Sequence, residues 1–447
     1  MRTRSWSAAS TLALSVVVTG PLVGAAVASP ARTPVQPVRL SSAFRQAQHP
    51  ALATDGHGDV ALVARGAGSH VLVSYRRAGH AWQRTRNLSG RREHNGAPRV
   101  AMGSNGFTAV AWHHRKALLV RTRRDNGSWT AAHAIHVGRY DELVGLAVNR
   151  HHKVAVEYMD DGNATFHVVV HIPHHRWRVT SPAGYAVQLQ IGLDDHGVVH
   201  GLEYEAEHGG VGRIHRTHLA PGGRWSKPRR FRAGTLMVED TQFAVSPSGA
   251  ETIGVGYVGK GWKSTFDTDL YWSTAHKVYR QARPGAPLRK VWDRNGARTL
   301  RFARAGRQLR LAWQQWQRPD NKGVPHRVAL QTQAVGHAAR TLAREPMTFD
   351  QNTDEFEGSY DFAVATGSAG AGAVLWRAWP ESGRSSPLLA TRVSGDRVWG
   401  PGTVSRATRA RVWAGTSVGT VAFGTKRTGY AAFTSNGGTR LDALPAH

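Results

Sequence analysis

The chain contains no cysteine among its 447 residues. Disulfides, thiolate metal sites and cysteine nucleophiles are therefore excluded together, and the fold must be held by core packing alone. The sequence also has no phosphate-binding P-loop, no dinucleotide-binding glycine pattern and no GxSxG nucleophile elbow. Beyond residue 28 it has no apolar run long enough to span a bilayer.

Acidic residues are scarce. Asp and Glu number 30 against 58 Lys and Arg, and the formal charge is +28. Such a charge favours polyanionic partners such as anionic cell-wall polymers or acidic polysaccharides. The basic residues are interleaved along the expected strands, which argues against a nucleic-acid groove. A bias of the source towards Arg codons is the alternative explanation.

The N-terminus is typical of a secretory signal peptide. A basic "MRTR" precedes the apolar "AASTLALSVVV", and "AVA" at Ala26–Ala28 offers small residues for cleavage. We predict a signal peptide over residues 1–28 and one domain over residues 29–447. Export by the general secretory route is expected, because the N-terminal segment has no Arg-Arg pair and no lipobox cysteine. An uncleaved anchor over Ala8–Ala28 is the alternative.

An internal repeat is the strongest signal. Ala97–Ile135 and His49–Ser89 each show short alternating runs separated by Gly, Asn or Asp turns, which is typical of half-buried strands. A Trp opens the fourth run at Trp82, Trp129, Trp177, Trp225 and Trp399, the first four 47 or 48 residues apart. The pattern predicts an all-β fold, a β-propeller with four-stranded antiparallel blades.

We predict eight blades, with seven as the alternative and a two-domain β-sandwich as a third reading. The last unit offers three strands, at 411–415, 419–425 and 429–435, followed by a tail. "PVQPVRLSS" (Pro34–Ser42) is similar to the fourth-strand sequences, so an N-terminal strand is expected to complete the C-terminal blade. That arrangement leaves no open edge between the termini.

The carboxylates are distributed unevenly between the two expected faces. Most fall on the face that carries the long loops and the connections between blades, where function tends to lie. Aromatic side chains occur in the same loops, and carboxylates beside Trp suit sugars, because the rings stack on sugar faces and the acids bind hydroxyl groups. The predicted ligand-binding residues are Trp262, Asp267, Asp269, Trp316, Glu203, Glu205 and Trp379, and Trp292 is expected in a neighbouring loop.

The stretch "FDQNTDEFEGSYDF" (Phe349–Phe362) concentrates five acids. Three readings remain open: a Ca²⁺ site, a catalytic site, and a loop paired with Arg. The metal candidates are Asp350, Asn352, Asp354 and Asp361, which follow positions 1, 3, 5 and 12 of a calcium loop. The catalytic candidates are Asp354, Glu355, Glu357 and Tyr360. His is abundant at 24 residues, but no spacing of His and carboxylates indicates a zinc site.

Two turns preceding a Trp carry a family resemblance. "RRDNGSW" (Arg123–Trp129) and "VSGDRVW" (Val393–Trp399) resemble the aspartate box of the sialidase and BNR-repeat propellers. In the first, Asp125, Gly127 and Trp129 match in kind, with one residue missing before the Trp. The resemblance implies a propeller like those of secreted bacterial members of the superfamily. The Arg-Ile-Pro element of active sialidases is absent.

Three functions follow as hypotheses. The first is a secreted propeller that binds a carbohydrate or another extracellular polymer through the acid- and Trp-rich face, without requiring catalysis. The second is a glycoside hydrolase or polysaccharide lyase of sialidase-like architecture. The third is a structural or protein-binding propeller that docks on an anionic cell surface through its basic outer wall.

Overall fold

The protein is described here by a computed structural model. It describes residues 36–55, 57–91, 94–138, 142–160, 165–173, 175–182, 188–206, 212–231, 237–258, 275–305, 307–316, 327–346, 348–350, 355–357, 360–367, 371–378, 388–394, 397–398, 402–405, 420–425, 428–435 and 438–444. For some whole segments, such as 388–394 and 402–405, and at the ends of others, only the backbone is described. All of them belong to one compact unit, Arg32–His447.

The chain forms antiparallel sheets from strands consecutive in sequence, except that β1 joins the last sheet. Each sheet is named here by the first strand of its consecutive run. The β2 sheet contains β2 (Gln48–Thr54), β3 (Val60–Arg65), β4 (Val71–Arg76) and β5 (Arg86–Asn87). The β6 sheet contains β6 (Arg99–Met102), β7 (Thr108–His114), β8 (Ala117–Arg123) and β9 (His133–His136). The β10 sheet contains β10 (Glu142–Val148), β11 (Val154–Asp160), β12 (Thr165–His171) and β13 (Arg178–Thr180).

The next three sheets repeat this order. The β14 sheet contains β14 (Gln188–Leu193), β15 (Val199–Ala206), β16 (Gly212–Leu219) and β17 (Arg229–Phe231). The β18 sheet contains β18 (Met237–Val245), β19 (Glu251–Val258), β20 (Ala275–Arg280) and β21 (Arg289–Asn295). The β22 sheet contains β22 (Ala297–Ala305), β23 (Gln308–Trp316), β24 (Arg327–Ala334) and β25 (Arg340–Pro346).

The remaining strands complete the ring. A hairpin of β26 (Thr348–Asp350) and β27 (Glu355–Glu357) precedes the β28 sheet. The β28 sheet contains β28 (Tyr360–Thr366), β29 (Ala371–Ala378), β30 (Leu388–Ser394), β31 (Arg397–Val398) and β32 (Gly402–Ser405). The β33 sheet contains β33 (Thr420–Thr425), β34 (Thr428–Ser435), β35 (Gly438–Leu444) and β1 (Gln36–Pro37). Two short 3₁₀ helices, η1 (Ser42–Gln46) and η2 (Ala67–Ser69), lie near the β2 sheet in sequence.

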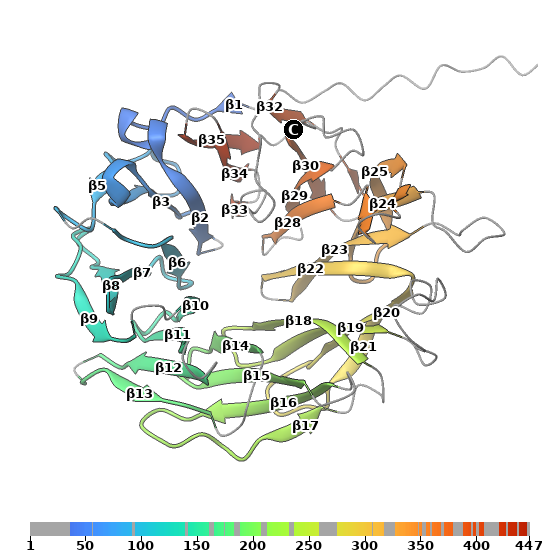
Figure 1. The fold of residues 1–447 in the computed structure, drawn as a ribbon, viewed down its shortest axis with the longest axis horizontal. Coiled ribbons are helices and arrows are strands. Elements are labelled where there is room, and N and C mark those ends of the chain that lie inside the picture. Colours follow the sequence, from blue (N-terminus) through green and yellow to red (C-terminus); the bar gives the residue numbers. More distant parts are fainter. Residues whose placement is uncertain are drawn as a thin grey trace, which may run out of the picture. The chain divides into compact units, whose positions relative to one another are not determined.

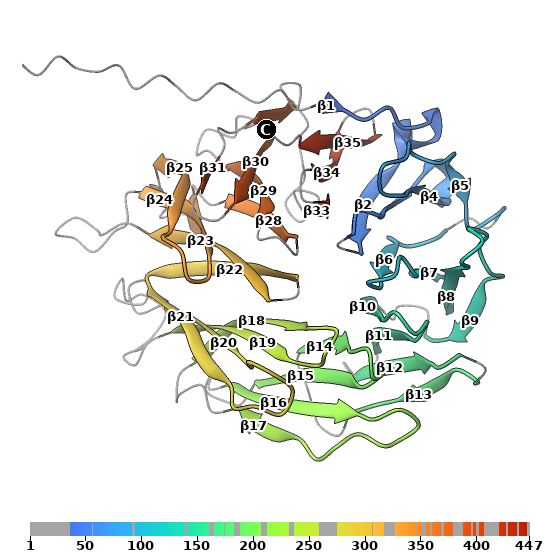
Figure 2. The same cartoon turned by 180° about the vertical axis from the view of Figure 1, so that it is seen from behind.

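The predicted β-propeller is confirmed. Besides the β26–β27 hairpin, the described residues form seven four-stranded sheets and one five-stranded sheet in the ring, within the predicted range of eight or seven blades. In that sheet β31 and β32 pair with different parts of the same edge of β30, so together they replace a single outer strand. The first strands face the centre of the ring in Figure 1, and Figure 2 shows the same arrangement from behind.

Burial follows the position of each strand in its sheet. The second strands lie between neighbouring sheets and are covered on both faces, as in β3, β7 and β11. The fourth strands are largely exposed and carry basic residues such as Arg86, Arg178 and Arg230. Eight buried apolar clusters each join two neighbouring sheets, so the core is a series of seams between sheets. No helix in the described part of the chain is long and apolar enough to cross a bilayer.

The ring closes as predicted, by an N-terminal strand. Gln36 and Pro37 of β1 pair with Ala443 and Asp442 of β35, and the Val38 N–H donates to the Leu441 carbonyl at 2.9 Å. The sequence prediction was wrong about the tail, because residues 438–444 form the third strand of this sheet. Asp442 is buried there and interrupts the alternation by which the strand could have been recognised.

The recurring Trp marks the corner before each fourth strand. Trp82, Trp129 and Trp225 each form a single bridge to the end of the third strand, just before β5, β9 and β17 begin. In "RRDNGSW" the turn requires Gly127, whose φ of +84° lies in the left-handed region. Trp292, expected in a loop, instead lies in β21 and is buried against Trp313, with ring centroids 4.9 Å apart.

Candidate functional site: an axial cavity and two polar clusters

A cavity of about 910 Å³ lies where the first strands of five successive sheets converge. Its lining comes mainly from the beginnings of β2, β6, β10 and β14, together with Phe243 of β18. In an antiparallel propeller the first strands begin on the face that receives the connections between sheets. The cavity therefore lies towards the loop face on which the sequence predicts function. Its polar lining residues include His49, Arg99, His113, Glu142, Gln188 and Gln190.

The inner edges of the first strands are braced by side chains from neighbouring sheets. Arg99 Nε donates to the Leu143 carbonyl at 3.1 Å, and Gln190 Nε2 donates to the Thr241 carbonyl at 2.6 Å. Gln242 continues the series, because its Nε2 donates to the Leu300 carbonyl at 2.6 Å. These bonds satisfy carbonyls that have no strand partner on the inner side, and they fix the cavity wall.

Glu157 is a buried acid behind this wall. It lies on β11, is 1% exposed, and accepts a hydrogen bond from the Ile191 N–H of the neighbouring sheet. Its Oε1 has no hydrogen-bond partner among the described residues. Gly145 is its direct partner on β10, where a register shift between Leu143 and Gly145 interrupts the pairing.

Burial raises the pKa of Glu157 to about 8, although the Arg99 charge and the Ile191 N–H both act to lower it. The carboxyl is therefore largely protonated at neutral pH. A neutral carboxyl can donate through its O–H while it accepts from Ile191. The sequence reasoning did not select Glu157. The available signal was a charged residue within the apolar second-strand run Val154–Tyr158.

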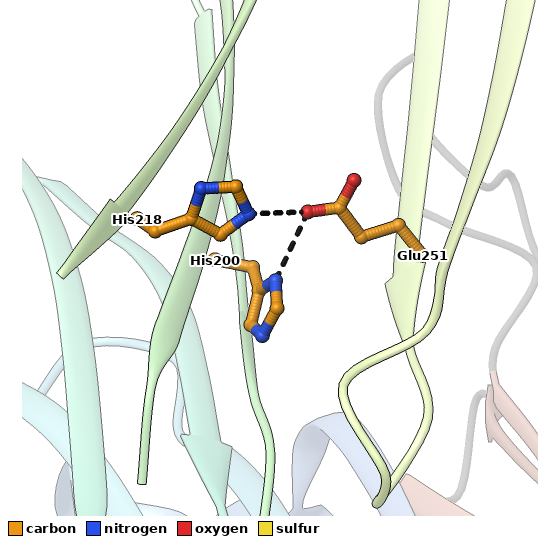
Figure 3. A group of neighbouring side chains, drawn as sticks. All are labelled: His200, His218 and Glu251. Carbon is orange, nitrogen blue, oxygen red and sulfur yellow. Dashed lines mark hydrogen bonds and ion pairs between the residues drawn. The ribbon is translucent and has the colours of Figure 1, made fainter. Parts of the chain in front are cut away.

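A second polar group crosses the seam between the β14 and β18 sheets. Figure 3 shows His200 and His218, from β15 and β16, pointing towards Glu251 of β19. His200 Nδ1 lies 3.0 Å and His218 Nε2 lies 2.8 Å from Glu251 Oε1. Arg216 Nε donates to Glu251 Oε2 at 2.6 Å, and Asp194 Oδ2 lies 3.2 Å from His200 Nε2.

This network is internally balanced. Burial acts to raise the pKa of Glu251, but the bonds from His200 and His218 and the Arg216 charge hold it at about 2. Burial likewise acts to lower the pKa of His200, but its bonds to Asp194 and Glu251 raise it above its usual value. Because each carboxylate here has a cationic or donor partner, the network is best explained as a brace between two sheets.

A third polar group consists of Glu203, Glu205 and His215, on the other face of the β14 sheet. His215 Nδ1 lies 3.4 Å from Glu205 Oε1. Burial, followed by the charge of Glu205, raises the pKa of Glu203 to about 7. Spacing along the sequence does not reveal this group, because its members lie on two paired strands.

Of the predicted site residues, Glu203 and Glu205 have described side chains; they lie together, and neither is among the residues that line the cavity. The backbones of several others are described: Trp316 ends β23, Asp350 ends β26, Glu355 and Glu357 bound β27, and Tyr360 and Asp361 begin β28. The side chains of these six are not described. Outside the described residues lie Trp262, Asp267, Asp269, Asn352, Asp354 and Trp379. The calcium, catalytic and Trp-based predictions therefore stay predictions.

No protein-family model matches the sequence, and no curated protein matches it. Several solved structures resemble it in fold. An ulvan lyase, a polysaccharide lyase, is 12% identical over 80% of this chain and 97% of its own, with a TM-score of 0.42. A lectin from Burkholderia pseudomallei is 14% identical over 81% of this chain and 100% of its own, with a TM-score of 0.46.

The β-propeller domain of the trilobed protease from Pyrococcus furiosus is 7% identical over 90% of this chain and 93% of its own, with a TM-score of 0.42. Likeness at this level describes the arrangement of strands and says nothing about chemistry. The resemblance to sialidases stays a prediction. By the order and closure of its own sheets, the chain is a β-propeller.

Proposed function

We propose that the protein binds a carbohydrate in the axial cavity, and that the ligand is an oligosaccharide carrying carboxylate groups. One observation carries this proposal: the cavity of about 910 Å³ presents an arginine, a glutamate and two glutamines on a braced wall. Arg99 and Glu142 are exposed, whereas Gln188 and Gln190 are half-buried. Side-chain amides and carboxylates bind sugar hydroxyls, and a guanidinium pairs with a carboxylate in two parallel bonds.

The charge of the molecule favours an acidic ligand over a neutral one. Arg99 lines the same cavity as Glu142, and the whole chain carries a formal charge of +28 with every His counted as neutral. A field of this sign increases the local concentration of anionic ligands and speeds their association. Binding should therefore weaken as salt is added, because screening acts over about 8–10 Å at physiological ionic strength.

A screen of matched oligosaccharides tests the proposal. Uronate-containing and neutral oligomers of equal length are titrated against the chain from residue 29 by calorimetry, at low and high salt. The proposal predicts saturable binding of a uronate oligomer, weaker at high salt and weaker still for the neutral oligomer. The absence of binding by every uronate oligomer, or binding that Arg99→Ala leaves unchanged, would contradict it.

Hydrolysis of the bound sugar is a second candidate, and one observation favours it. Glu142 and Glu157 line one cavity, with Glu142 exposed and Glu157 held protonated by burial. A glycosidase requires a pair of carboxyl groups, one of which is protonated and serves as the general acid. Binding is the better supported function because the Glu157 carboxyl is covered. Glu157→Gln separates the two, since it should retain binding but abolish any turnover.

Secretion and attachment to an anionic surface complete the proposal. The N-terminal "MRTR" and the apolar run after it support export. The exposed fourth strands, with Arg86, Arg178 and Arg230, give the outer wall a basic character. Secreted protein should be found outside the cell and should be released from anionic cell-wall material by salt. Retention inside the cell would overturn the proposed location without affecting the cavity.

A further inference from the structure

Glu203, Glu205 and His215 lie together on one face of the β14 sheet. Glu203 and His215 are direct partners across β15 and β16, and Glu205 lies two residues beyond Glu203 on the same face. Leu189, the partner of Glu203 on β14, packs against the β10 sheet. The three side chains therefore point into the seam between the β10 and β14 sheets. One ligand atom from each lies within 4.8 Å of the others.

The group is buried but not satisfied. Glu203 is 0% exposed, and neither of its carboxylate oxygens has a hydrogen-bond partner among the described residues. His215 Nδ1 is also buried without a hydrogen bond, although Glu205 Oε1 lies 3.4 Å away. A buried polar atom without a partner is costly. Three such atoms occur here in a group whose ligand atoms lie within 4.8 Å of one another, which points to a bound species.

The His200, His218 and Glu251 network provides the contrast. There each ring nitrogen facing Glu251 is at hydrogen-bond distance, and Arg216 neutralises the second carboxylate oxygen. No cation is needed to satisfy that network. The Glu203 group has two carboxylates and one imidazole, and among the described residues its ion pair is the one between His215 and Glu205.

We propose that Glu203, Glu205 and His215 bind a divalent first-row cation, Zn²⁺ or Mn²⁺. Two carboxylate ligands and one imidazole nitrogen suit these ions. Ca²⁺ fits less well because it takes six to eight oxygen ligands. Glu205 and His215 have side chains 26% and 15% exposed, so solvent can reach the group from their side and supply the remaining ligands. The ion would join β15 and β16 at the seam with the β10 sheet.

Metal content and melting temperature test the site. Untagged chain from residue 29 is stripped with a chelator and dialysed against Zn²⁺ or Mn²⁺ at pH 8, and bound metal is counted by mass spectrometry. We expect one ion per chain and an increase of several degrees in melting temperature with metal. Glu203→Gln and His215→Gln should lower the affinity at least 100-fold and abolish the increase. His218→Gln is the matched control from the other cluster and should retain both.

The isosteric Glu203→Gln also controls for misfolding. In chelator it removes a buried charge without changing side-chain shape, so it should melt no lower than the chelated wild type. A wild-type chain that binds neither ion would overturn the proposal. Binding that survives Glu203→Gln would also overturn it. If such binding were lost in His218→Gln, the ion would belong to the group of His200, His218 and Glu251 instead.

Discussion

Gly145 and Glu157 face one another across β10 and β11, and the Glu157 carboxylate occupies the space that a β-carbon at residue 145 would need. The absence of a side chain at position 145 is what allows a carboxyl to lie behind the cavity wall. From that position Glu157 reaches the backbone of Ile191 and links the β10 sheet to the β14 sheet. The glycine is therefore required by close contact rather than by backbone conformation.

Gly145→Ala should destabilise the protein by about 1–3 kcal/mol, because the added methyl group overpacks the seam and displaces the Glu157 carboxyl. The same substitution in a Glu157→Ala background should cost much less, since the space is then free. Urea unfolding of the two single variants and the double variant gives the coupling directly. Additive costs would show that the two residues do not compete for the same space.

The burial of Glu157 predicts a pH dependence. Its pKa of about 8 in the folded chain lies above the ordinary value of 4.5, so between these values the folded state holds a proton that the unfolded state has lost. The contribution of Glu157 to stability should fall as pH rises through this range, by up to about 1.4 kcal/mol per unit.

Glu157→Gln isolates this contribution, because the amide resembles the protonated acid and does not titrate. The stability of the variant relative to wild type should increase as the pH rises from about 4.5 to about 8. Above about pH 8 the difference in unfolding free energy should stay constant. Chemical denaturation at each pH measures it. A difference that does not change with pH would mean that Glu157 is ionised and solvated.

Glu251→Gln should cost about 3–5 kcal/mol, because it leaves Arg216 in the seam without its anion and leaves His200 with Asp194 alone. The pKa of Glu251 is lowered to about 2. The contribution of the Glu251 carboxylate to folding stability should therefore be complete above about pH 4.5 and be lost as the pH falls towards 2. Denaturation of the variant and wild type at pH 7 and pH 3 measures both effects.

The exposed pair Lys290–Asp293, with atoms 2.6 Å apart, is the matched control for this experiment. Asp293→Asn should change stability little, because solvent screens an exposed ion pair. Equal costs for Glu251→Gln and Asp293→Asn would show that the seam is wet and that its network does not brace the two sheets.

The short strand β1 should be necessary for a closed ring. A chain that begins at residue 41 loses the pairing of Gln36 and Pro37 with β35 and exposes the edge of that strand. It should melt lower and associate more readily than a chain that begins at residue 29. Melting curves and size-exclusion chromatography compare the two chains. Identical behaviour would show that β1 is not needed and that the apolar packing around Phe44 is enough to close the ring.

The repeat made the fold predictable because its signals are local. Alternation within strands, the turn before Trp129 and the similarity of the N-terminal segment to fourth strands all lie within a few residues. The third strand of the last sheet was missed because buried Asp442 interrupts that alternation. Trp292 was misplaced for a related reason, since a strand rich in charged residues resembles a loop.

The sites were less predictable because they depend on contacts across seams. Glu157 and Ile191 belong to different sheets, and His215 approaches Glu205 only once β15 and β16 are paired. Sequence spacing carries no information on such distances. Glu203 and Glu205 were selected for their place on the loop face, whereas the structure shows them turned into a seam.

Calorimetric titration of a uronate oligosaccharide into the wild type, Arg99→Ala and Arg230→Ala distinguishes a ligand in the axial cavity from one on the outer wall. Arg99 lines the cavity, whereas Arg230 is exposed on the outer strand β17 and serves as the matched control for charge. We predict that Arg99→Ala weakens binding by about tenfold to 100-fold and that Arg230→Ala leaves it nearly unchanged. Equal weakening by both variants would contradict a ligand in the cavity and would place it on the basic outer wall.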